Sequence, residues 1–287
     1  DLPAEFIKLS EDRQSITFID GFKAGTFLMH GATDLNYYQL GQIKRVRVVR
    51  RADGYYAQFC IQHERREEIH VSEQVTALDV GLLHFYTDNR GDRVENPRHL
   101  RKSEKALKRL QRKVSRKVKG SNKRSIAINK LGRKHLKLSR QRKDFAVKLA
   151  RCVVTSNDVV VFEALRVRNM VKNHHLAQSI SDAAWRQFFD WLEYYGQVFG
   201  KIVVPVPPQW SSQECSSCGQ IVKKSLSTRT HVCSCGASLC RDENAAKVLL
   251  ARGLKIASST LGHSGINAQG QINLCQSSEN LVDKLTG

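Results

Sequence analysis

The chain has 287 residues, 41% of them hydrophobic, which is enough for a sizeable core in one large domain or two smaller ones. No apolar run approaches the roughly 18 residues that a membrane span needs, and the first residues are not a basic-then-apolar export signal, so we expect a cytoplasmic protein without a membrane partner. The formal charge of +20 at pH 7 favours a polyanionic partner instead.

Residues 5–62 are predicted to be entirely β-structure. Two short runs, SITFID and GTFLMH, precede two longer runs, IKRVRVVR and YYAQFCIQ, which flank residues 52–54. The Asp-Gly pair in that connection is a strong hairpin signal between strands. We therefore expect a small sheet or partial β-barrel, and we assign residues 1–73 to it.

A second set of strands follows. These strands are the first elements of a core domain, to which we assign residues 74–208. VTALDVG (75–81) and HFYTDN (84–89) predict a hairpin. Further along, DVVVFEAL (158–165) and KIVVPV (201–206) predict buried strands. A helix is expected between these two strands, over about residues 182–198.

Residues 98–151 carry the whole excess of positive charge. They contain 22 lysines and arginines against two acids, whereas the rest of the chain is balanced. Apolar residues recur at helical spacing on both sides of a Gly-Ser-Asn break at 120–122, which predicts a basic helical hairpin inserted in the core. A solvated pair of surface helices is the alternative. The near absence of acids favours nucleic-acid binding, because such a segment gains affinity by releasing counterions from phosphates.

The residues expected to contact nucleic acid lie in this hairpin and in the cysteine-rich segment that follows the core. They are Lys102, Lys105, Arg109, Arg112, Arg116, Arg133, Lys134, Arg140, Lys223, Lys224 and Arg229. Contacts of this kind hold a phosphate backbone and do not read a base sequence.

Three acids are placed where isolated carboxylates would be costly. Asp79 lies near the end of one apolar strand and Glu163 at the end of another, while Asp242 opens the last predicted helix. Either strand acid alone could be a simple strand-end cap. Together the three would repel one another and need cations, and oxygen ligands favour two Mg²⁺ or Mn²⁺ ions, which can assist phosphodiester hydrolysis. Strand Asp, strand Glu and helix Asp is the order of the ribonuclease H-like fold.

Four of the eight cysteines form two close pairs. Cys215 and Cys218 are spaced C-x-x-C, and Cys233 and Cys235 are spaced C-x-C, with a glycine after each pair. Four thiolates at these spacings predict one tetrahedral structural Zn²⁺ in a zinc-ribbon insert over residues 209–238. Unligated buried thiols are the alternative, and Cys240 is a possible fifth thiol.

Aromatic and histidine clusters have ordinary interpretations as well as functional ones. Trp185, Phe188, Phe189 and Trp191 could stack on bases, but their spacing within one helix favours core positions. The pair at residues 174–175, two histidines, is interpreted as solvent-exposed. Residues 239–262 are assigned to the last core segment, and residues 263–287, rich in Gly, Ser, Asn and Gln, to a loose tail.

Four segments in order resemble the OrfB/TnpB family of transposon-encoded nucleases. They are LDVGL (78–82), FEALRVRNMVKNHHLAQSISDAAW (162–185), SSQECSSCG (211–219) and CRDENAA (240–246). The resemblance covers nearly the whole chain up to about residue 262. It implies an α/β fold with a ribonuclease H-like, RuvC-type core, similar to the nuclease lobe of type V CRISPR effectors.

The resemblance also implies a function and a set of site residues. Members of the family are RNA-guided DNA endonucleases whose guide RNA derives from the transposon end. We expect this chain to be monomeric in protein. Asp79, Glu163 and Asp242 would be the catalytic, metal-binding acids. The predicted four-cysteine zinc site would lie in the segment that binds target nucleic acid. The partners expected are guide RNA and target DNA, with a location at the nucleoid.

This chain departs from the family pattern at two places. Cys240 stands where the family usually has Asp or another polar residue. The region before the core leaves room for part of a barrel but not for a full recognition lobe. A catalytically idle nucleic-acid-binding regulator, or a truncated remnant, therefore stays open as the alternative function.

Overall fold

The structure is a computed structural model that describes residues 2–261, apart from positions 4, 5, 20, 22, 32, 33 and 226. The chain divides into two compact units, one formed by residues 1–65 and 105–137 and the other by residues 66–104 and 138–287. The predicted tail at 263–287 lies outside the described residues. In the described part of the chain, no helix has the length and apolar character that crossing a membrane requires.

The first unit contains two three-stranded antiparallel sheets in place of one continuous barrel. One sheet has the order β1-β5-β6 and the other the order β2-β3-β4. A small core around Ile16, Ile43 and Val46 joins their apolar sides. The strands are β1 (Leu2–Pro3), β2 (Ile7–Leu9), β3 (Ser15–Phe18), β4 (Thr26–Leu28), β5 (Ile43–Arg51) and β6 (Gly54–Ile61).

The predicted β5–β6 hairpin is confirmed, with Arg51 paired to Gly54 across the turn. Two 3-10 turns, at Leu35–Tyr37 and Leu40–Gln42, precede it. Helix α2 (Asn122–Ser156) packs against this turn within the first unit. Nε of Arg133 donates to the carbonyl of Ala52 at 3.2 Å, and a Cβ at Gly132 would lie 2.9 Å from the Ala52 Cβ.

The predicted basic helices are present. Helix α1 (His99–Ser115) and helix α2 are separated by a turn in which Gly120 has a φ of +83°. That left-handed conformation favours glycine, which explains the position of the break. Helix α2 continues five residues beyond the predicted end at Arg151, to Ser156, because its last turns are buried beside the sheet of the second unit at Val153 and Val154.

The second unit is built on a five-stranded sheet with the order β11-β10-β7-β8-β9. Strands β7 (Val75–Val80), β8 (His84–Asp88) and β9 (Arg93–Glu95) form an antiparallel meander. Strand β10 (Val159–Glu163) pairs parallel to β7, and β11 (Ile202–Val206) pairs parallel to β10. The hairpin and both later strands were therefore predicted correctly, whereas β9 was not predicted.

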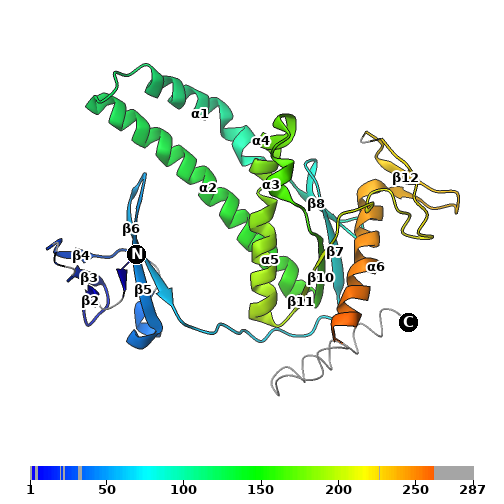
Figure 1. Cartoon of the computed structure of the whole chain (residues 1–287), viewed down its shortest axis with the longest axis horizontal. Helices are drawn as coiled ribbons and strands as arrows, with labels where there is room; N and C mark the ends of the chain where they lie inside the picture. The colour runs from blue at the N-terminus through cyan, green and yellow to red at the C-terminus, as the bar shows by residue number, and fades with distance from the viewer. Residues whose placement is uncertain are drawn as a thin grey trace. The chain divides into compact units, whose positions relative to one another are not determined.

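Helices cover both faces of this sheet (Figure 1). One face packs on the end of α2 and on helices α4 (His174–Ala183) and α5 (Trp185–Phe199), and the other packs on α6 (Arg241–Leu261). Successive side chains of a strand point to opposite faces of the sheet. Val160 and Phe162 of β10 therefore pack in the core on the α5 side, and Val159 and Val161 pack in the core on the α6 side. A short helix, α3 (Val167–Met170), and the strands β12 (Thr230–Val232) and β13 (Ser238–Cys240) complete the unit.

The helix predicted over about residues 182–198 is confirmed as α5, which begins three residues later, whereas α4 before it was not predicted and ends at a break at Ala184. That residue has a φ of +55°, and it ends α4 and begins α5. Asp182, at the end of α4, is buried and accepts hydrogen bonds from the N–H groups of Leu100 and Arg101 at the start of α1. It also pairs with Arg142 of α2 at 3.0 Å. The break thus lets one carboxylate hold three helices together.

Candidate carboxylate site and cysteine knot

Asp79 and Glu163 lie at the ends of two adjacent parallel strands and on the same face of the sheet: Asp79 is the last residue but one of β7, and Glu163 is the last residue of β10. The register pairs Val161 with Ala77 and Phe162 with Leu78, so the next step along both strands brings Glu163 level with Asp79. Side chains alternate in direction along a strand, so the two acids point to the side on which Ala77 and Val161 contact α6. The strand pairing therefore brings together two acids that are 84 positions apart in the sequence.

Asp242 reaches the same place from the first turn of α6. Its Oδ1 pairs with Nε of Arg241 at 3.2 Å, and the two side chains are 23% and 18% exposed. An acid in the first turn of a helix is also stabilised by the helix dipole, which is a sufficient structural reason for one carboxylate but not for three. The close approach of α6 to the sheet depends on Gly253, where a Cβ would lie 2.4 Å from a methyl group of Val161.

The electrostatics place Asp79 within reach of the charges of the other two acids. Burial raises the pKa of Asp79 well above its ordinary value, and the charges of Glu163 and Asp242 raise it further, while Arg241 opposes the rise. Burial also raises the pKa of Glu163, against a hydrogen bond from Ser211 and the charge of Arg252. The site therefore resists holding three negative charges, which a divalent cation would relieve.

Ser211 and Arg252 are two supporting residues that the sequence reasoning missed. The hydroxyl of Ser211 donates to Oε1 of Glu163 at 2.9 Å and is itself buried. Arg252 of α6 donates to the carbonyl of Gln209 at 2.8 Å and pairs with Glu214, which holds the loop after β11 against the helix. A serine four residues before a cysteine pair carries no signal of this role in one sequence.

The donor set of the acids fits hard cations such as Mg²⁺ or Mn²⁺, since all its ligand atoms are carboxylate oxygens. Within the described ranges, however, only one group of three or more His, Cys, Asp or Glu side chains has all its ligand atoms within 4.8 Å of one another, and it is the cysteine group. The oxygen atoms of the three carboxylates are therefore not as close together as the cysteine sulfurs are. In this arrangement Asp242 is hydrogen-bonded to Arg241, and Glu163 is hydrogen-bonded to Ser211.

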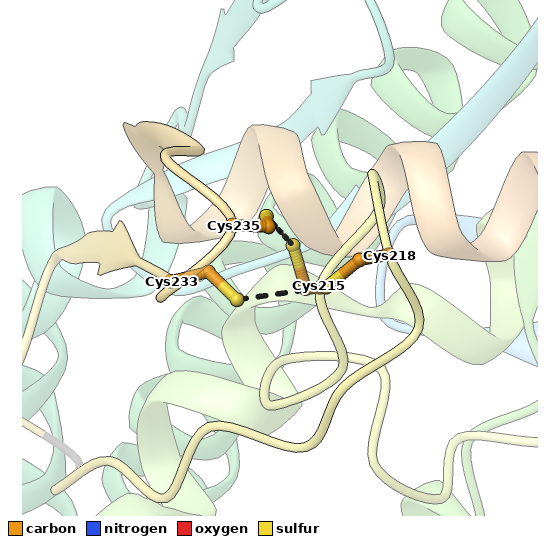
Figure 2. A group of neighbouring side chains, drawn as sticks. All are labelled: Cys215, Cys218, Cys233 and Cys235. Carbon is orange, nitrogen blue, oxygen red and sulfur yellow. Dashed lines mark hydrogen bonds between the residues drawn. The ribbon is translucent and has the colours of Figure 1, made fainter.

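The four predicted cysteines, all of them free thiols, come together in one group, which is called the cysteine knot here without implying disulfides. Figure 2 shows their side chains converging from two separate loops. The sulfurs of Cys215 and Cys235 are 3.7 Å apart, and those of Cys218 and Cys233 are 3.6 Å apart. A tetrahedral zinc with Zn–S bonds of about 2.3 Å places its sulfurs roughly 3.8 Å apart. The four thiols therefore fit a structural Zn²⁺ closely.

Asn244 connects the knot to the helix that carries Asp242. It is fully buried, accepts from the N–H of Ser216 at 3.0 Å and donates to the carbonyl of Glu214 at 2.7 Å. Arg241 adds a second connection by donating to the carbonyl of Thr228 at 3.1 Å. Asp242 lies between Arg241 and Asn244 in the first turn of α6, and both of these neighbours are hydrogen-bonded to the cysteine-rich segment. This is a structural reason for an acid that follows the cysteines so closely in the sequence.

Cys240 lies outside the four-cysteine group. Nη2 of Arg93 donates to its sulfur at 3.3 Å, and a charge on that sulfur would raise the pKa of Asp79. Its thiol therefore belongs to the surroundings of Asp79 and Arg93 and is not part of the four-cysteine group.

The aromatic residues on α5 are core residues, as predicted. Trp185, Phe188 and Phe189 are at most 3% exposed, and Trp191 is partly buried against the same core. The two histidines at 174 and 175 are exposed, with their rings 3.8 Å apart.

The basic residues predicted to bind nucleic acid are placed on the surface. All are exposed except Lys134 and Lys224, which are half-buried. On α1, Lys105, Arg109 and Arg112 fall at spacings of four and three residues, so they share one face of the helix. Nζ of Lys224 is already engaged by the carbonyl of Ser212 at 3.2 Å and by His231, so a phosphate would compete for it. Their contacts with nucleic acid stay a prediction.

The fold and the site thus define a mixed α/β protein that carries acids at the ends of two inner strands of its sheet and a group of four cysteines on the segment before α6. Two family models match the chain in sequence order. The OrfB model, described as "Probable transposase", matches residues 58–174, and the model described as "Cas12f1-like, TNB domain" matches residues 185–249.

Several curated proteins are similar to this chain. A Streptomyces pristinaespiralis protein named "Putative RNA-guided DNA endonuclease" is 41% identical over 195 residues, which are 67% of this chain and 48% of that protein. The Escherichia coli K12 protein named "Putative RNA-guided DNA endonuclease InsQ" is 31% identical over 230 residues, 74% of this chain and 57% of that protein. The chain belongs to the OrfB/TnpB family, and it spans about half the length of these two relatives.

A solved structure is also similar. The chain aligns with a protein in the cryo-EM structure of a Cas12f1-sgRNA-target DNA complex at 13% identity and a TM-score of 0.43, over 85% of this chain and 64% of the other.

Proposed function

We propose that this chain is the nuclease part of an RNA-guided DNA endonuclease, in which Asp79, Glu163 and Asp242 hold divalent cations for hydrolysis of DNA phosphodiesters. One observation carries the proposal: acids from β7, β10 and α6 converge so closely that the charges of two raise the pKa of the third. The relatives named RNA-guided DNA endonucleases support the substrate and the guide. A meander followed by two parallel strands is the strand order of a ribonuclease H-like core, which supports the RuvC-type assignment.

Each part of the site has a task in this proposal. Bound Mg²⁺ or Mn²⁺ would supply charge neutralisation and an activated water. The hydroxyl of Ser211 orients the Glu163 carboxylate, and Arg241 occupies Asp242 until a cation competes for it. The exposed lysines and arginines of α1 and α2 hold nucleic-acid backbones, and a Zn²⁺ in the cysteine knot keeps the start of α6 in place.

The test compares Asp79→Asn, Glu163→Gln and Asp242→Asn with the parent chain. The matched control is Asp190→Asn, which alters an exposed acid of α5 that pairs with Arg186. Cleavage of single-stranded and plasmid DNA is measured with Mg²⁺ and co-purified RNA, and Mn²⁺ binding is followed by electron paramagnetic resonance. We expect each site variant to lose at least about a hundredfold in cleavage rate and to bind Mn²⁺ more weakly, with RNA binding and the control unchanged.

Two results would count against this function. Cleavage within tenfold of the parent rate in any site variant would show that the acids are not the catalytic ligands. A parent chain that binds RNA, DNA and Mn²⁺ but leaves DNA intact would favour the non-cleaving regulator.

A further inference from the structure

Trp210 is an exposed tryptophan in the loop that follows β11. Its side chain is 60% exposed, whereas the other two tryptophans, Trp185 and Trp191, pack in the core around α5. In the described part of the chain, its indole belongs to no buried apolar cluster and makes no aromatic or cation–π contact. Single exposed apolar side chains are common on protein surfaces, so exposure alone assigns no role to this residue.

The backbone of Trp210 is the less ordinary feature. Its φ is +63°, and it is the one aromatic residue among those described that has a positive φ. Bulky side chains rarely adopt this left-handed conformation, whereas glycine adopts it freely. The turn therefore does not call for a tryptophan. Residues held in such conformations gather at binding and catalytic sites, which makes the side chain the feature to explain.

Hydrogen bonds fix the loop on both sides of Trp210. The carbonyl of Trp210 accepts from the N–H groups of Gln213 at 2.9 Å and Glu214 at 2.8 Å. The preceding carbonyl, that of Gln209, accepts from Arg252 of α6 at 2.8 Å. The exposed indole is thus carried by a backbone that is held in place.

The same loop holds one of the three candidate catalytic acids. Ser211, the residue after Trp210, donates from its hydroxyl to Oε1 of Glu163 at 2.9 Å. Adjacent Cα atoms are about 3.8 Å apart, so the indole begins one residue away from a contact of the carboxylate site. The fold therefore places an exposed, flat aromatic side chain next to the residues proposed to cut DNA.

An unpaired nucleobase is the ligand whose chemistry fits this side chain. Proteins that bind single strands stack successive bases on aromatic side chains, and every base offers a face for this contact. Stacking does not read the base sequence, which suits a site that cuts wherever a guide directs it. The charge of +20 favours a nucleic acid over an apolar protein surface as the partner.

We propose that Trp210 stacks on an unpaired base of the DNA strand that enters the carboxylate site, within a few nucleotides of the phosphodiester to be cut. This contact would hold the strand beside Glu163 without selecting its sequence. The proposal rests on the proposed function for its substrate, and it adds a substrate-binding residue that is not one of the acids or the basic residues of α1 and α2.

Three substitutions at residue 210 and one control test the proposal in the full chain. Trp210→Leu keeps an apolar side chain in the left-handed position but removes the aromatic face. Trp210→Phe keeps a smaller aromatic ring. Trp210→Gly removes the side chain and suits the backbone conformation. The control is Ile221→Ala, which shortens an apolar side chain of the cysteine-rich segment that is 46% exposed.

Binding is measured with two fluorescent single strands of equal length, one of thymidines and one of abasic nucleotides. Fluorescence anisotropy reports affinity in the presence of Ca²⁺ in place of Mg²⁺, so that strand cleavage does not contribute. The abasic strand keeps the phosphates and lacks the bases, so the cycle formed by two proteins and two strands isolates the contact between residue 210 and a base. Cleavage of the thymidine strand is measured separately with Mg²⁺.

We expect Trp210→Leu and Trp210→Gly to bind the thymidine strand about 5- to 100-fold more weakly than the parent, with binding of the abasic strand within about twofold. Trp210→Phe should lie between the parent and Trp210→Leu, and Ile221→Ala should match the parent. The loss should be equal at low and high salt, because stacking releases no counterions. The kcat/KM for cleavage should fall by a similar factor.

Four outcomes would overturn the inference. Unchanged binding and cleavage in Trp210→Leu would show that the indole does not hold the strand. Equal losses on the thymidine and abasic strands would show that no base is contacted. Loss of the co-purified RNA from Trp210→Leu would assign the residue to RNA, and an equal loss in Ile221→Ala would reduce the effect to apolar surface.

The binding cycle separates this inference from the proposed function, because it needs no cleavage. A parent chain that leaves DNA intact but shows the coupling between Trp210 and the bases would refute the nuclease and support the stacking contact. Normal cleavage in Trp210→Leu, with cleavage lost in Glu163→Gln, would do the reverse. If Trp210→Leu did not give the circular dichroism spectrum of the parent, Trp210→Gly and Trp210→Phe would decide the matter.

Discussion

Gly253 of α6 is the position at which one added methyl group should act most directly on the candidate site. A Cβ there would lie 2.4 and 2.5 Å from the two methyl groups of Val161 and 3.0 Å from its Cβ. Val161 is fully buried in the centre of β10, so it has little room to move away. We predict that Gly253→Ala destabilises the second unit and pushes α6, with Asp242, away from the strand acids.

Two effects of opposite sign determine how much Gly253→Ala changes the free energy of unfolding. Replacing glycine by alanine inside a helix stabilises it by about 1 kcal/mol through backbone propensity. Overpacking a close contact costs about 1–3 kcal/mol. The net change in the free energy of unfolding is therefore a loss of about 0–2 kcal/mol, where propensity alone would give a gain of about 1 kcal/mol.

Urea unfolding followed by circular dichroism and tryptophan fluorescence measures this change. Ala251→Gly, at an exposed position of the same helix, reports propensity alone and should cost about 1 kcal/mol. Adding Val161→Ala to Gly253→Ala removes the two clashing methyl groups, so the double variant should be more stable than the sum of the single effects by about 1–2 kcal/mol. A Gly253→Ala chain that is more stable than the parent, with no coupling to residue 161, would refute the close packing of α6.

Three further predictions concern charge and metal. Because the folded chain raises the pKa of Asp79, it binds this proton more tightly than the unfolded chain does. Without added Mg²⁺, stability should therefore rise as the pH falls through that raised pKa towards the ordinary value of an aspartate. Asp79→Asn should raise the melting temperature at neutral pH and weaken this dependence; an unchanged thermal profile would contradict the crowding of acids. Replacing Lys105, Arg109 and Arg112 by Gln should flatten the salt dependence of DNA binding by up to about three units of slope, measured by fluorescence anisotropy. Elemental analysis should find one zinc per chain in the parent and a marked loss in Cys218→Ser.

Local patterns in the sequence were sufficient for much of the fold. Short apolar runs predicted β7, β10 and β11, and the Gly-Ser-Asn break predicted the connection between the two basic helices, although the first helix ends earlier, at Ser115. Such features depend on residues close together in the chain, where alternation and turn chemistry constrain the backbone directly. The break at Ala184 has no such signal, because alanine favours a continuous helix. It is imposed by tertiary contacts, among them those of Asp182 with α1 and α2.

The cysteine knot and the identity of the three acids could be predicted from spacing and from a family resemblance. Which side chains support them could not. Ser211, Arg252 and Asn244 act on residues up to 48 positions away, through contacts that no local period encodes.

The sequence thus specified which residues could carry the chemistry: carboxylates at the ends of apolar strands, thiols in close pairs and one dense run of positive charge. The tertiary structure alone decided that β7 and β10 are parallel neighbours in register, that α6 approaches the sheet through Gly253, and that Cys240 contacts Arg93 outside the four-cysteine group. The physical reason is that strand pairing and helix packing are settled by burial between distant segments. A change of one residue in register would turn Asp79 away from Glu163 without altering any local pattern.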